Sequence, residues 1–247
     1  MRIVSLVPSL TELIAELGRI GDLVGRTRYC VEPAGRIESV EELGGTKNPD
    51  LDRIEELRPD LVVMSAEENR REDYLRLQSA GLQVFVVHPR TVAGAARMID
   101  ELGRRIGAGR AARDLSRRCV EAAGGAPAEP LGVFCPIWRA PWMTFGGRTY
   151  VADVLRTCGY RSVFDDEDRD FFEVSLEQVA LRRPHAVLLP DEPYRFSLEH
   201  RTELREAGID VPAVLIDGRD LSWYGPRIPR ALARLRALRR ELARSSD

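Results

Sequence analysis

The sequence carries a weak internal repeat, and this feature constrains the fold more than any other. Residues 51–63 read as the end of a helix, an Arg-Pro turn and an apolar strand, and residues 176–188 have the same order about 125 positions later. A second pair of segments, 77–84 and 204–211, matches at an offset of about 127 positions. Two matches in the same order favour a duplication over a chance likeness between helix-to-strand turns. The chain of 247 residues is therefore predicted to form two similar lobes with a cleft between them.

Strand-like and helix-like segments alternate along the chain, which predicts an α/β fold with parallel sheets and helices outside them. Apolar runs such as 61–64 and 187–189 fit strands that are covered on both faces. The expected strands are 2–7, 23–26, 60–65, 83–87, 131–137, 185–190 and 213–217. The expected helices are 10–18, 50–57, 70–80, 92–105, 109–123, 149–158, 175–182, 198–207 and 227–243.

The middle of the chain differs because residues 91–123 are almost entirely helical in pattern. Gly103, Gly107 and Gly109 are expected to break this stretch into two helices, and the second would span about 22 Å. The predicted domains are an N-terminal α/β lobe at 1–90, a helical linker with a backbone helix at 91–125, and a C-terminal α/β lobe at 126–247. A helical joint of this kind favours limited opening over a large hinge motion.

Composition and spacing exclude several classes of site. The net charge of −2 gives no indication of nucleic-acid binding. The four Cys and three His residues lack metal-ligand spacing, and Cys119, Cys135 and Cys158 are expected in the core. No phosphate-loop, dinucleotide or nucleophile motif is present. We therefore assign no catalytic residue, no metal ligand and no cofactor of the protein's own.

The N-terminal residues indicate where the protein works. Residues 2–7 already have a strand pattern, and Ser9 to Glu12 read as a capping box that begins a helix. No leader pattern precedes them and no segment is long enough to span a bilayer, so we expect no membrane insertion. The sequence as written predicts a cytoplasmic protein, or a periplasmic or extracellular one if a native export signal has been removed.

Candidate ligand contacts lie after the strands, because ligands gather at the carboxyl ends of parallel strands. All three Trp residues lie in the second half of the chain. Trp142 and Trp223 stand in loops beside prolines and polar residues, which favours contact with a planar or apolar ligand. Phe134 and Phe164 are expected in the core instead. The predicted cleft is thus asymmetric, with an aromatic wall on the second lobe and a polar wall on the first.

Several carboxylates follow the strands and leave three roles open. Glu67, Glu68, Glu173, Asp191 and Glu192 could act as an acid/base pair, bind a cationic or metal-bearing ligand, or cap helices. Capping is the expected role for Glu68 or its neighbour Asn69. In the same region, Lys47 follows two glycines and could meet an anion.

Four segments together resemble a known family: 4–12, 44–50, 57–62 and 223–228. They are similar to the class III substrate-binding proteins, the helical-backbone metal receptors that bind cobalamin and iron–siderophores for ABC importers. The resemblance implies two Rossmann-like lobes joined by a long backbone helix, with the ligand held between them. It also implies a corrinoid or another metal chelate as ligand and an ABC permease as partner.

Some positions match the cobalamin-receptor branch of that family and others depart from it. Trp223 matches an aromatic position of the branch, whereas Ser65 stands where a further Trp is expected. Glu72 is a candidate acid for docking on a permease, but the turn at 223–227 lacks the corresponding acid on the second lobe. The helix at 109–123 is short for the family's backbone helix.

The leading hypothesis is a non-enzymatic substrate-binding protein for a corrinoid or siderophore-like metal chelate. A second hypothesis keeps the fold and makes the chain a cytosolic carrier, sensor or biosynthetic accessory protein. A third is an enzyme with opposed carboxylates, which predicts at least one strongly shifted carboxyl pKa. The predicted ligand-binding residues are Ser9, Tyr29, Lys47, Glu67, Glu68, Trp138, Trp142, Phe172, Glu192, Trp223 and Tyr224.

Overall fold

The computed structural model describes residues 1–125 and 129–244, and the chain divides into two compact units. The first three residues of the predicted C-terminal lobe, 126–128, and its last three, 245–247, lie outside the described residues. Unit 1 comprises Met1–Pro89, Gly94–Arg118 and Tyr224–Pro226, and unit 2 comprises Arg90–Ala93, Cys119–Trp223 and the chain from Arg227. The segment predicted as a helical linker is therefore divided between the two units.

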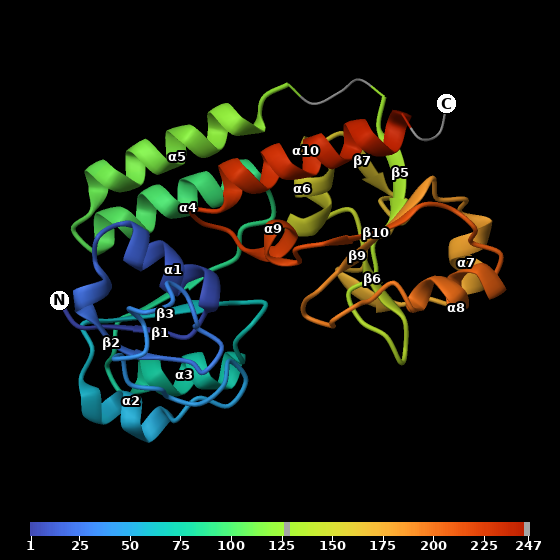
Figure 1. Ribbon diagram of the computed structural model, residues 1–247. Coiled ribbons are helices and arrows are strands. Elements are labelled where there is room, and N and C mark those ends of the chain that lie inside the picture. The colour runs from blue at the N-terminus through green and yellow to red at the C-terminus, as the bar shows by residue number, and fades with distance from the viewer. Residues whose placement is uncertain (126–128, 245–247) are drawn as a thin grey trace. The chain divides into compact units, whose positions relative to one another are not determined.

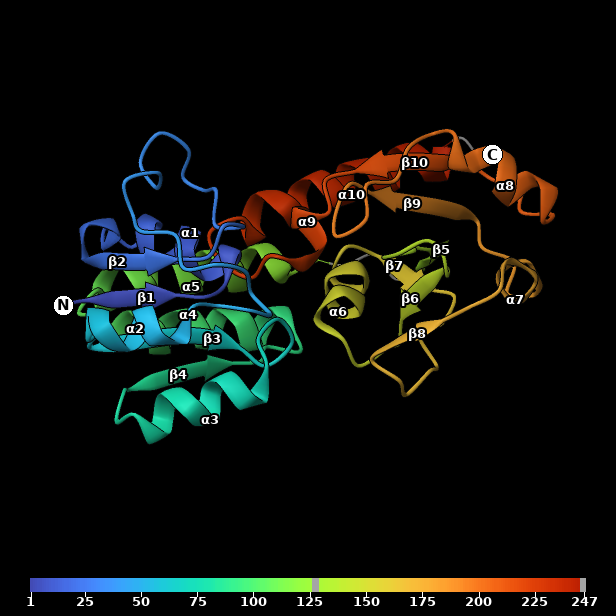
Figure 2. The same cartoon turned by 90° about the horizontal axis from the view of Figure 1, so that it is seen from below.

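Unit 1 is built on a four-stranded parallel sheet with the strand order β2-β1-β3-β4. Its strands are β1 (Ile3–Ser5), β2 (Leu23–Arg26), β3 (Leu61–Ser65) and β4 (Val84–Val87). Figure 2 shows their arrowheads at one edge of the sheet. The helices are α1 (Pro8–Glu16), η1 (Ile20–Asp22), α2 (Leu51–Leu57), α3 (Arg71–Ser79), α4 (Val92–Arg105) and α5 (Gly109–Ala123).

The sheet of unit 1 is covered on both faces, as the continuous apolar runs predict. Val4, Val62 and Met64 point to one face and pack with Ile54 of α2 and Leu77 of α3. Because side chains alternate along a strand, their neighbours point to the other face. Figure 1 shows α1, α4 and α5 on that side. The carboxyl edge of the sheet is thus left to loops.

Unit 2 contains a second parallel sheet with the strand order β10-β9-β5-β7, and a two-stranded antiparallel sheet of β6 and β8. The strands are β5 (Leu131–Phe134), β6 (Met143–Phe145), β7 (Tyr160–Ser162), β8 (Phe171–Glu173), β9 (Ala186–Pro190) and β10 (Ala213–Ile216). The helices are α6 (Tyr150–Thr157), α7 (Leu176–Leu181), α8 (His200–Glu206), α9 (Arg219–Ser222) and α10 (Ile228–Arg244).

The internal repeat is confirmed by the topology. When the strands of each parallel sheet are counted along the chain, their order across the sheet is second, first, third, fourth. This order is β2-β1-β3-β4 in unit 1 and β7-β5-β9-β10 in unit 2. The repeated Arg-Pro turns match as well, since Arg58 and Arg183 have φ values of 46° and 48°. Gly81 and Gly208, which end the equivalent helices α3 and α8, have φ values of 80° and 81°. A left-handed residue ends each helix and turns the chain into the next strand.

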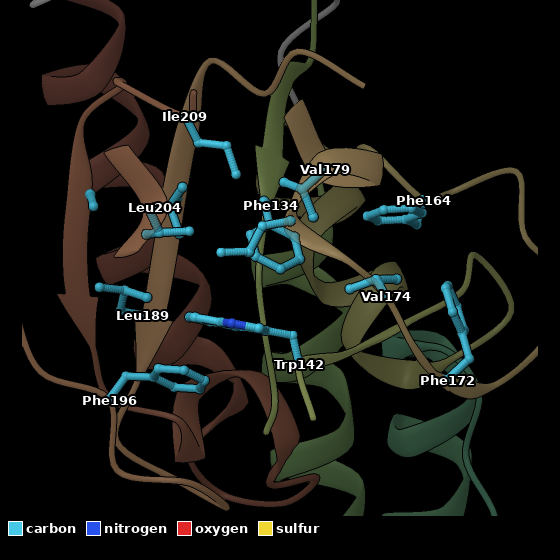
Figure 3. Packing of buried hydrophobic residues seen from close by; sticks show 13 residues of the cluster. Phe134, Trp142, Phe164, Phe172, Val174, Val179, Leu189, Phe196, Leu204 and Ile209 are labelled. Atoms are coloured by element: carbon cyan, nitrogen blue, oxygen red, sulfur yellow. The ribbon is translucent and has the colours of Figure 1, made fainter. Parts of the chain in front are cut away.

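The core of unit 2 repeats the arrangement with more aromatic side chains. Phe134 and Leu189 on the sheet pack with Val179 of α7 and Leu204 of α8 (Figure 3). The hydroxyl of Tyr160 donates a hydrogen bond to the carbonyl of Leu235, 3.0 Å away on α10. The four cysteines are buried, which confirms the core role predicted for three of them. Phe134 and Phe164 are core residues as predicted.

Most predicted elements are present, and α4 and α5 have the predicted bounds. Three short strands, β6, β7 and β8, were not predicted. The predicted strand at 131–137 ends at Phe134. The capping box at Ser9 is wrong, because α1 begins at Pro8 and its N-cap residue, Val7, makes no side-chain capping bond. Proline is favoured at a first helical position because it has no N–H to satisfy.

The close approach of α4 and α5 depends on Gly103. A Cβ built on Gly103 would lie 2.0 Å from the Cβ of Ala112. We expect Gly103→Ala to lower the free energy of unfolding by about 1–3 kcal/mol, because overpacking outweighs the gain in helix propensity. Urea denaturation measures this, with Gly21→Ala as control, since a Cβ at Gly21 has no atom within 4 Å. Equal stability of the two variants would contradict the proposed packing.

Candidate functional site

The carboxyl edge of the sheet in unit 1 is held together by Asn69. Its Oδ1 accepts a hydrogen bond from the N–H of Ser65 at 2.8 Å, and its Nδ2 donates to the carbonyls of Leu6 and Thr46 at 3.1 and 3.0 Å. Asn69 therefore ties together the loops after β1 and β3 and the loop around Thr46. The strand order reverses between β1 and β3, which is where open α/β sheets bind ligands.

The structure corrects the capping role expected for Glu68 or Asn69. Helix α3 begins at Arg71, its N-cap is Arg70, and no side chain caps it. Asn69 is buried, with both ends of its amide in use. Glu68 is half-buried in the same loop.

Lys47, Glu67 and His88 form a polar group at this edge. Lys47 Nζ donates a hydrogen bond to the carbonyl of Glu67 at 2.9 Å. The carboxylate of Glu67 lies 3.3 Å from Nε2 of His88, which follows β4. Two of the predicted ligand residues are thus brought together. Tyr29, another of them, is 56% exposed and lies beside the same loop as Lys47, next to Gly45.

Ser9 and Tyr224 are buried parts of unit 1. Ser9 is 3% exposed, and within the described residues its Oγ has no hydrogen-bond partner. The hydroxyl of Tyr224 donates a hydrogen bond of 2.8 Å to Oγ of Ser65. At the position where the resemblance leads us to expect a Trp, the chain therefore has a buried serine bonded to a tyrosine. This arrangement gives Tyr224 a structural role in unit 1.

The corresponding edge of unit 2 carries a pair of aromatic rings, of which one is exposed and the other half-buried. Trp138, in the loop after β5, is 43% exposed. Its ring meets that of Tyr194, in the loop after β9, edge to face at a centroid distance of 5.6 Å. The strand order of unit 2 reverses between β5 and β9, so this pair lies at the switch point of its sheet. Tyr194 was not among the predicted site residues.

Two other predicted aromatic residues belong to the core of unit 2. Trp142 is 8% exposed, stacks on Phe196 with a centroid distance of 5.6 Å, and donates a hydrogen bond of 2.9 Å from Nε1 to Glu203. Phe172, on β8, is 6% exposed and packs edge to face on Phe164. Figure 3 shows these rings among the apolar side chains of the cluster. The side chains of Trp142 and Phe172 therefore stabilise the core of unit 2.

Glu192 and Trp223 lie at the carboxyl edge of unit 2, after β9 and β10. Glu192 is half-buried, and burial raises the pKa of its carboxyl group above the ordinary value, although Arg219 and a hydrogen bond from Trp223 oppose this. The ring of Trp223 lies 4.9 Å from Cζ of Arg227 and 5.8 Å from Cζ of Arg219. A raised pKa gives Glu192 a larger fraction of the neutral, hydrogen-bond-donating form.

Unit 2 also contains a cavity of about 740 Å³ that no feature of the sequence predicted. We call it the arginine cavity; its lining residues are Arg90, Arg148, Asp168, Arg169, Asp170 and Phe171. They come from three segments far apart in the sequence, so no local motif could have revealed them.

The part of the chain that the structure describes holds no group of three or more His, Cys, Asp or Glu residues placed to bind a metal ion. Burial raises the pKa values of the thiols of Cys30 and Cys135. Within residues 1–125 and 129–244, no helix is both long enough and apolar enough to cross a membrane.

Comparison with known proteins gives consistent likenesses. A family model described as "Periplasmic binding protein" matches residues 3–192. The vitamin B12-binding protein of Photorhabdus laumondii is 26% identical over 194 residues, which cover 76% of this chain and 70% of the relative. That of Pectobacterium carotovorum is 24% identical, over 92% of this chain and 84% of the relative.

Solved structures share the fold. The periplasmic vitamin B12-binding protein of Vibrio cholerae superposes with a TM-score of 0.82 at 21% identity, covering 98% of this chain and 97% of that one. The periplasmic heme-binding protein of Roseiflexus sp. RS-1 gives a TM-score of 0.84 at 22% identity and covers 98% of both chains. Both likenesses confirm the predicted α/β fold with parallel sheets.

The role of the Asn69 hydrogen bonds can be tested by mutation. We expect Asn69→Ala to lower the free energy of unfolding by about 2–4 kcal/mol, because it leaves the N–H of Ser65 and two carbonyls without their partner. Urea denaturation measures the change, and Asn48→Ala, at an exposed position, is the matched control. A loss of stability no larger than that of Asn48→Ala would show that the hydrogen bonds of Asn69 do not stabilise this edge of the sheet.

The raised pKa of Glu192 predicts how stability depends on pH. The folded protein holds this proton at pH values where the unfolded chain, with an ordinary pKa of 4.5, has lost it. The contribution of Glu192 to stability therefore falls as pH rises above 4.5. We expect Glu192→Gln to be more stable than the parent at pH 8, with the difference shrinking at pH 4.

Thermal unfolding at several pH values measures this difference, with Glu173→Gln, at an exposed position on β8, as control. A difference that is the same at pH 4 and pH 8, or one that grows on acidification, would be inconsistent with a raised pKa at Glu192.

Proposed function

The chain belongs to the periplasmic binding protein family, and from this premise we propose that it is a substrate-binding protein for a corrinoid or another large metal chelate. The curated relatives described above are vitamin B12-binding proteins, and the similar solved structures bind vitamin B12 or heme. These ligands are all large, planar and metal-bearing. We propose that this chain binds a compound of the same kind and delivers it to an ABC permease.

The contact between the exposed Trp138 and the half-buried Tyr194 is the observation that carries this proposal. An exposed aromatic ring is typical of a binding surface, and Trp138 lies at the switch point of a parallel sheet, against the half-buried ring of Tyr194. Their edge-to-face contact fixes the orientation of both rings before a ligand arrives, so little conformational entropy is lost on binding. A planar macrocycle offers a flat apolar surface against which such rings can pack.

Unit 1 has polar groups at the carboxyl edge of its own sheet that suit ligand binding. Lys47 is exposed and its ammonium group is held by the carbonyl of Glu67. Tyr29 is exposed beside the same loop. We propose that Lys47 and Tyr29 donate hydrogen bonds to peripheral oxygen atoms of the ligand, with Glu67 and His88 holding the local geometry.

We infer that the chain acts by binding rather than by catalysis, as the name of its family indicates. The carboxylate of Glu67 is engaged by His88, and burial raises the pKa values of Cys30 and Cys135 and so disfavours a nucleophilic thiolate. Glu72, exposed in the first turn of α3, is the residue we propose for docking on a permease. The description of the family as periplasmic supports a location outside the cytoplasm.

Titration with cyanocobalamin tests the proposed function. We expect saturable binding in isothermal titration calorimetry, with a change in the visible spectrum of the corrinoid. Trp138→Ala is expected to weaken binding by about tenfold or more, because aromatic contacts of this kind contribute about 1–2 kcal/mol or more.

Leu181→Ala is the control, since Leu181 is 83% exposed at the end of α7 and so lies at the opposite edge of the sheet, where β9 begins. The absence of heat and spectral change at high micromolar cyanocobalamin would rule out the corrinoid. An equal effect of the two substitutions would rule out the aromatic pair as its binding surface.

A further inference from the structure

Trp138 stands in a short hairpin that leads from β5 into β6. We call residues 138–143 the Trp138 hairpin. Two main-chain hydrogen bonds close its base: the N–H of Met143 donates to the carbonyl of Trp138 at 3.0 Å, and the N–H of Ile137 donates to the carbonyl of Met143 at 2.9 Å. The position of the Trp138 ring therefore depends on how firmly this hairpin is held to the rest of unit 2.

Glu203 of α8 holds the hairpin at two points. Nε of Arg139 donates a hydrogen bond to Oε2 of Glu203 at 2.8 Å, and Nη2 of Arg139 lies 2.8 Å from the same oxygen. Nε1 of Trp142 donates to the other oxygen, Oε1, at 2.9 Å. One carboxylate therefore binds both ends of the segment 139–142. Hydrogen bonds to a charged group are stronger than those between neutral groups.

The backbone of the hairpin shows why such a hold is needed. Ala140 lies between the two residues that Glu203 binds and has a φ value of 65°. This left-handed conformation is unfavourable for a residue with a Cβ, and it persists only where surrounding contacts impose it. Ala140 is itself exposed, so its own side chain contributes little to that restraint. The contacts of Arg139 and Trp142 with Glu203 supply a restraint on either side of it.

The charge state of Glu203 suits both contacts. Burial alone would raise the pKa of its carboxyl group, but hydrogen bonds from Arg139 and Trp142 outweigh burial and hold this pKa below the ordinary value of 4.5. Glu203 is therefore a carboxylate at neutral pH, and both of its oxygens are acceptors.

The same helix also contacts Tyr194, the residue against which the Trp138 ring packs. His200 lies one turn before Glu203 on α8, so the two side chains share a face of the helix. Nε2 of His200 lies 3.3 Å from the hydroxyl of Tyr194, and the N–H of Ser197 donates to Nδ1 of His200 at 3.1 Å. Helix α8 thus contacts Tyr194 directly and Trp138 through its hairpin.

We propose that Glu203 is a positioning residue of the ligand surface, which fixes the Trp138 hairpin and so presets the Trp138 ring against Tyr194. Its effect reaches the ligand through Trp138, because both oxygens of its carboxylate bind the hairpin. A surface that is ordered before binding loses less conformational entropy when the ligand arrives. The inference rests on the proposed function for its ligand, whereas the order of the hairpin can be measured without one.

Hydrogen exchange measures the order of the hairpin. We expect Glu203→Gln to speed the exchange of the Ile137 and Met143 amides by about tenfold or more, because the lost charge weakens both contacts and makes local opening easier. Exchange of the amides in β9 should be unchanged. Glu206→Gln is the matched control, since it removes the same charge from an exposed position of α8. The urea midpoint of each variant shows whether it is folded as the parent is.

A double-mutant cycle with cyanocobalamin tests whether Glu203 acts through Trp138. By isothermal titration calorimetry, Glu203→Gln should weaken binding by about three- to tenfold in the parent and by less than about twofold in a Trp138→Ala background. A residue that only stabilises the fold would have the same effect in both backgrounds. Arg139→Lys keeps one charged contact with Glu203, so it should lose less affinity than Arg139→Gln.

Three results would overturn the inference. The first is parental exchange of the hairpin in folded Glu203→Gln. The others, where the parent binds cyanocobalamin, are an unchanged affinity of Glu203→Gln and a loss of affinity that is the same with and without Trp138. Failure of the proposed function looks different: the parent then binds no cyanocobalamin, while Glu203→Gln still speeds the exchange of the hairpin. That result would support the hold of Glu203 on the hairpin and rule out the corrinoid as the ligand of this surface.

Discussion

Parallel strand pairing is the constraint on which the rest of the structure depends. In each unit the first strand pairs in parallel with two neighbours, β1 with β2 and β3, and β5 with β7 and β9. Parallel neighbours cannot be joined by a tight turn, so helices must connect them, and the loops gather at one edge. The chain then crosses from β1 to β2 toward one side of the sheet and from β3 to β4 toward the other, and the crossings from β5 to β7 and from β9 to β10 diverge in the same way. The candidate residues reach the switch points because of this pairing and not because of any local motif.

The elements of the fold could be predicted from the sequence to the extent that local physics determines them. The repeat was visible because the turns at Arg58 and Arg183 need the same left-handed conformation in both copies. The bounds of α4 and α5 were marked by glycines and by a clear helical pattern. Strands β6, β7 and β8 have three residues each and were not recognised, whereas β1, of the same length, lies within the longer, mostly apolar run at 3–7. A capping motif at Ser9 was outweighed by a proline one position earlier.

The candidate site was harder to predict, because it depends on contacts between distant segments. Trp142 and Phe172 stand beside loop residues in the sequence, yet the pairing of β6 with β8 brings them into the core. Asn69 has the sequence context of a helix cap, but its amide bonds to Leu6, 63 positions away. Most of the aromatic residues in the second half of the chain therefore serve packing, while Trp138 stays exposed beside the half-buried Tyr194.

A chain with a single lysine and many arginines shows why the setting of an arginine matters more than its presence. On α4, Arg104 and Arg105 pair with acids one turn away, which is an ordinary arrangement on a solvated helix face. Arg148 and Arg169 are different, because they converge on one cavity from separate segments and are held by a main-chain carbonyl and an aromatic ring. Helix-face pairs neutralise each other locally and direct no charge at a ligand. Arg148 and Arg169 also have acids beside them, Asp168 and Glu167, so what distinguishes them is their convergence on one cavity and not a surplus of charge.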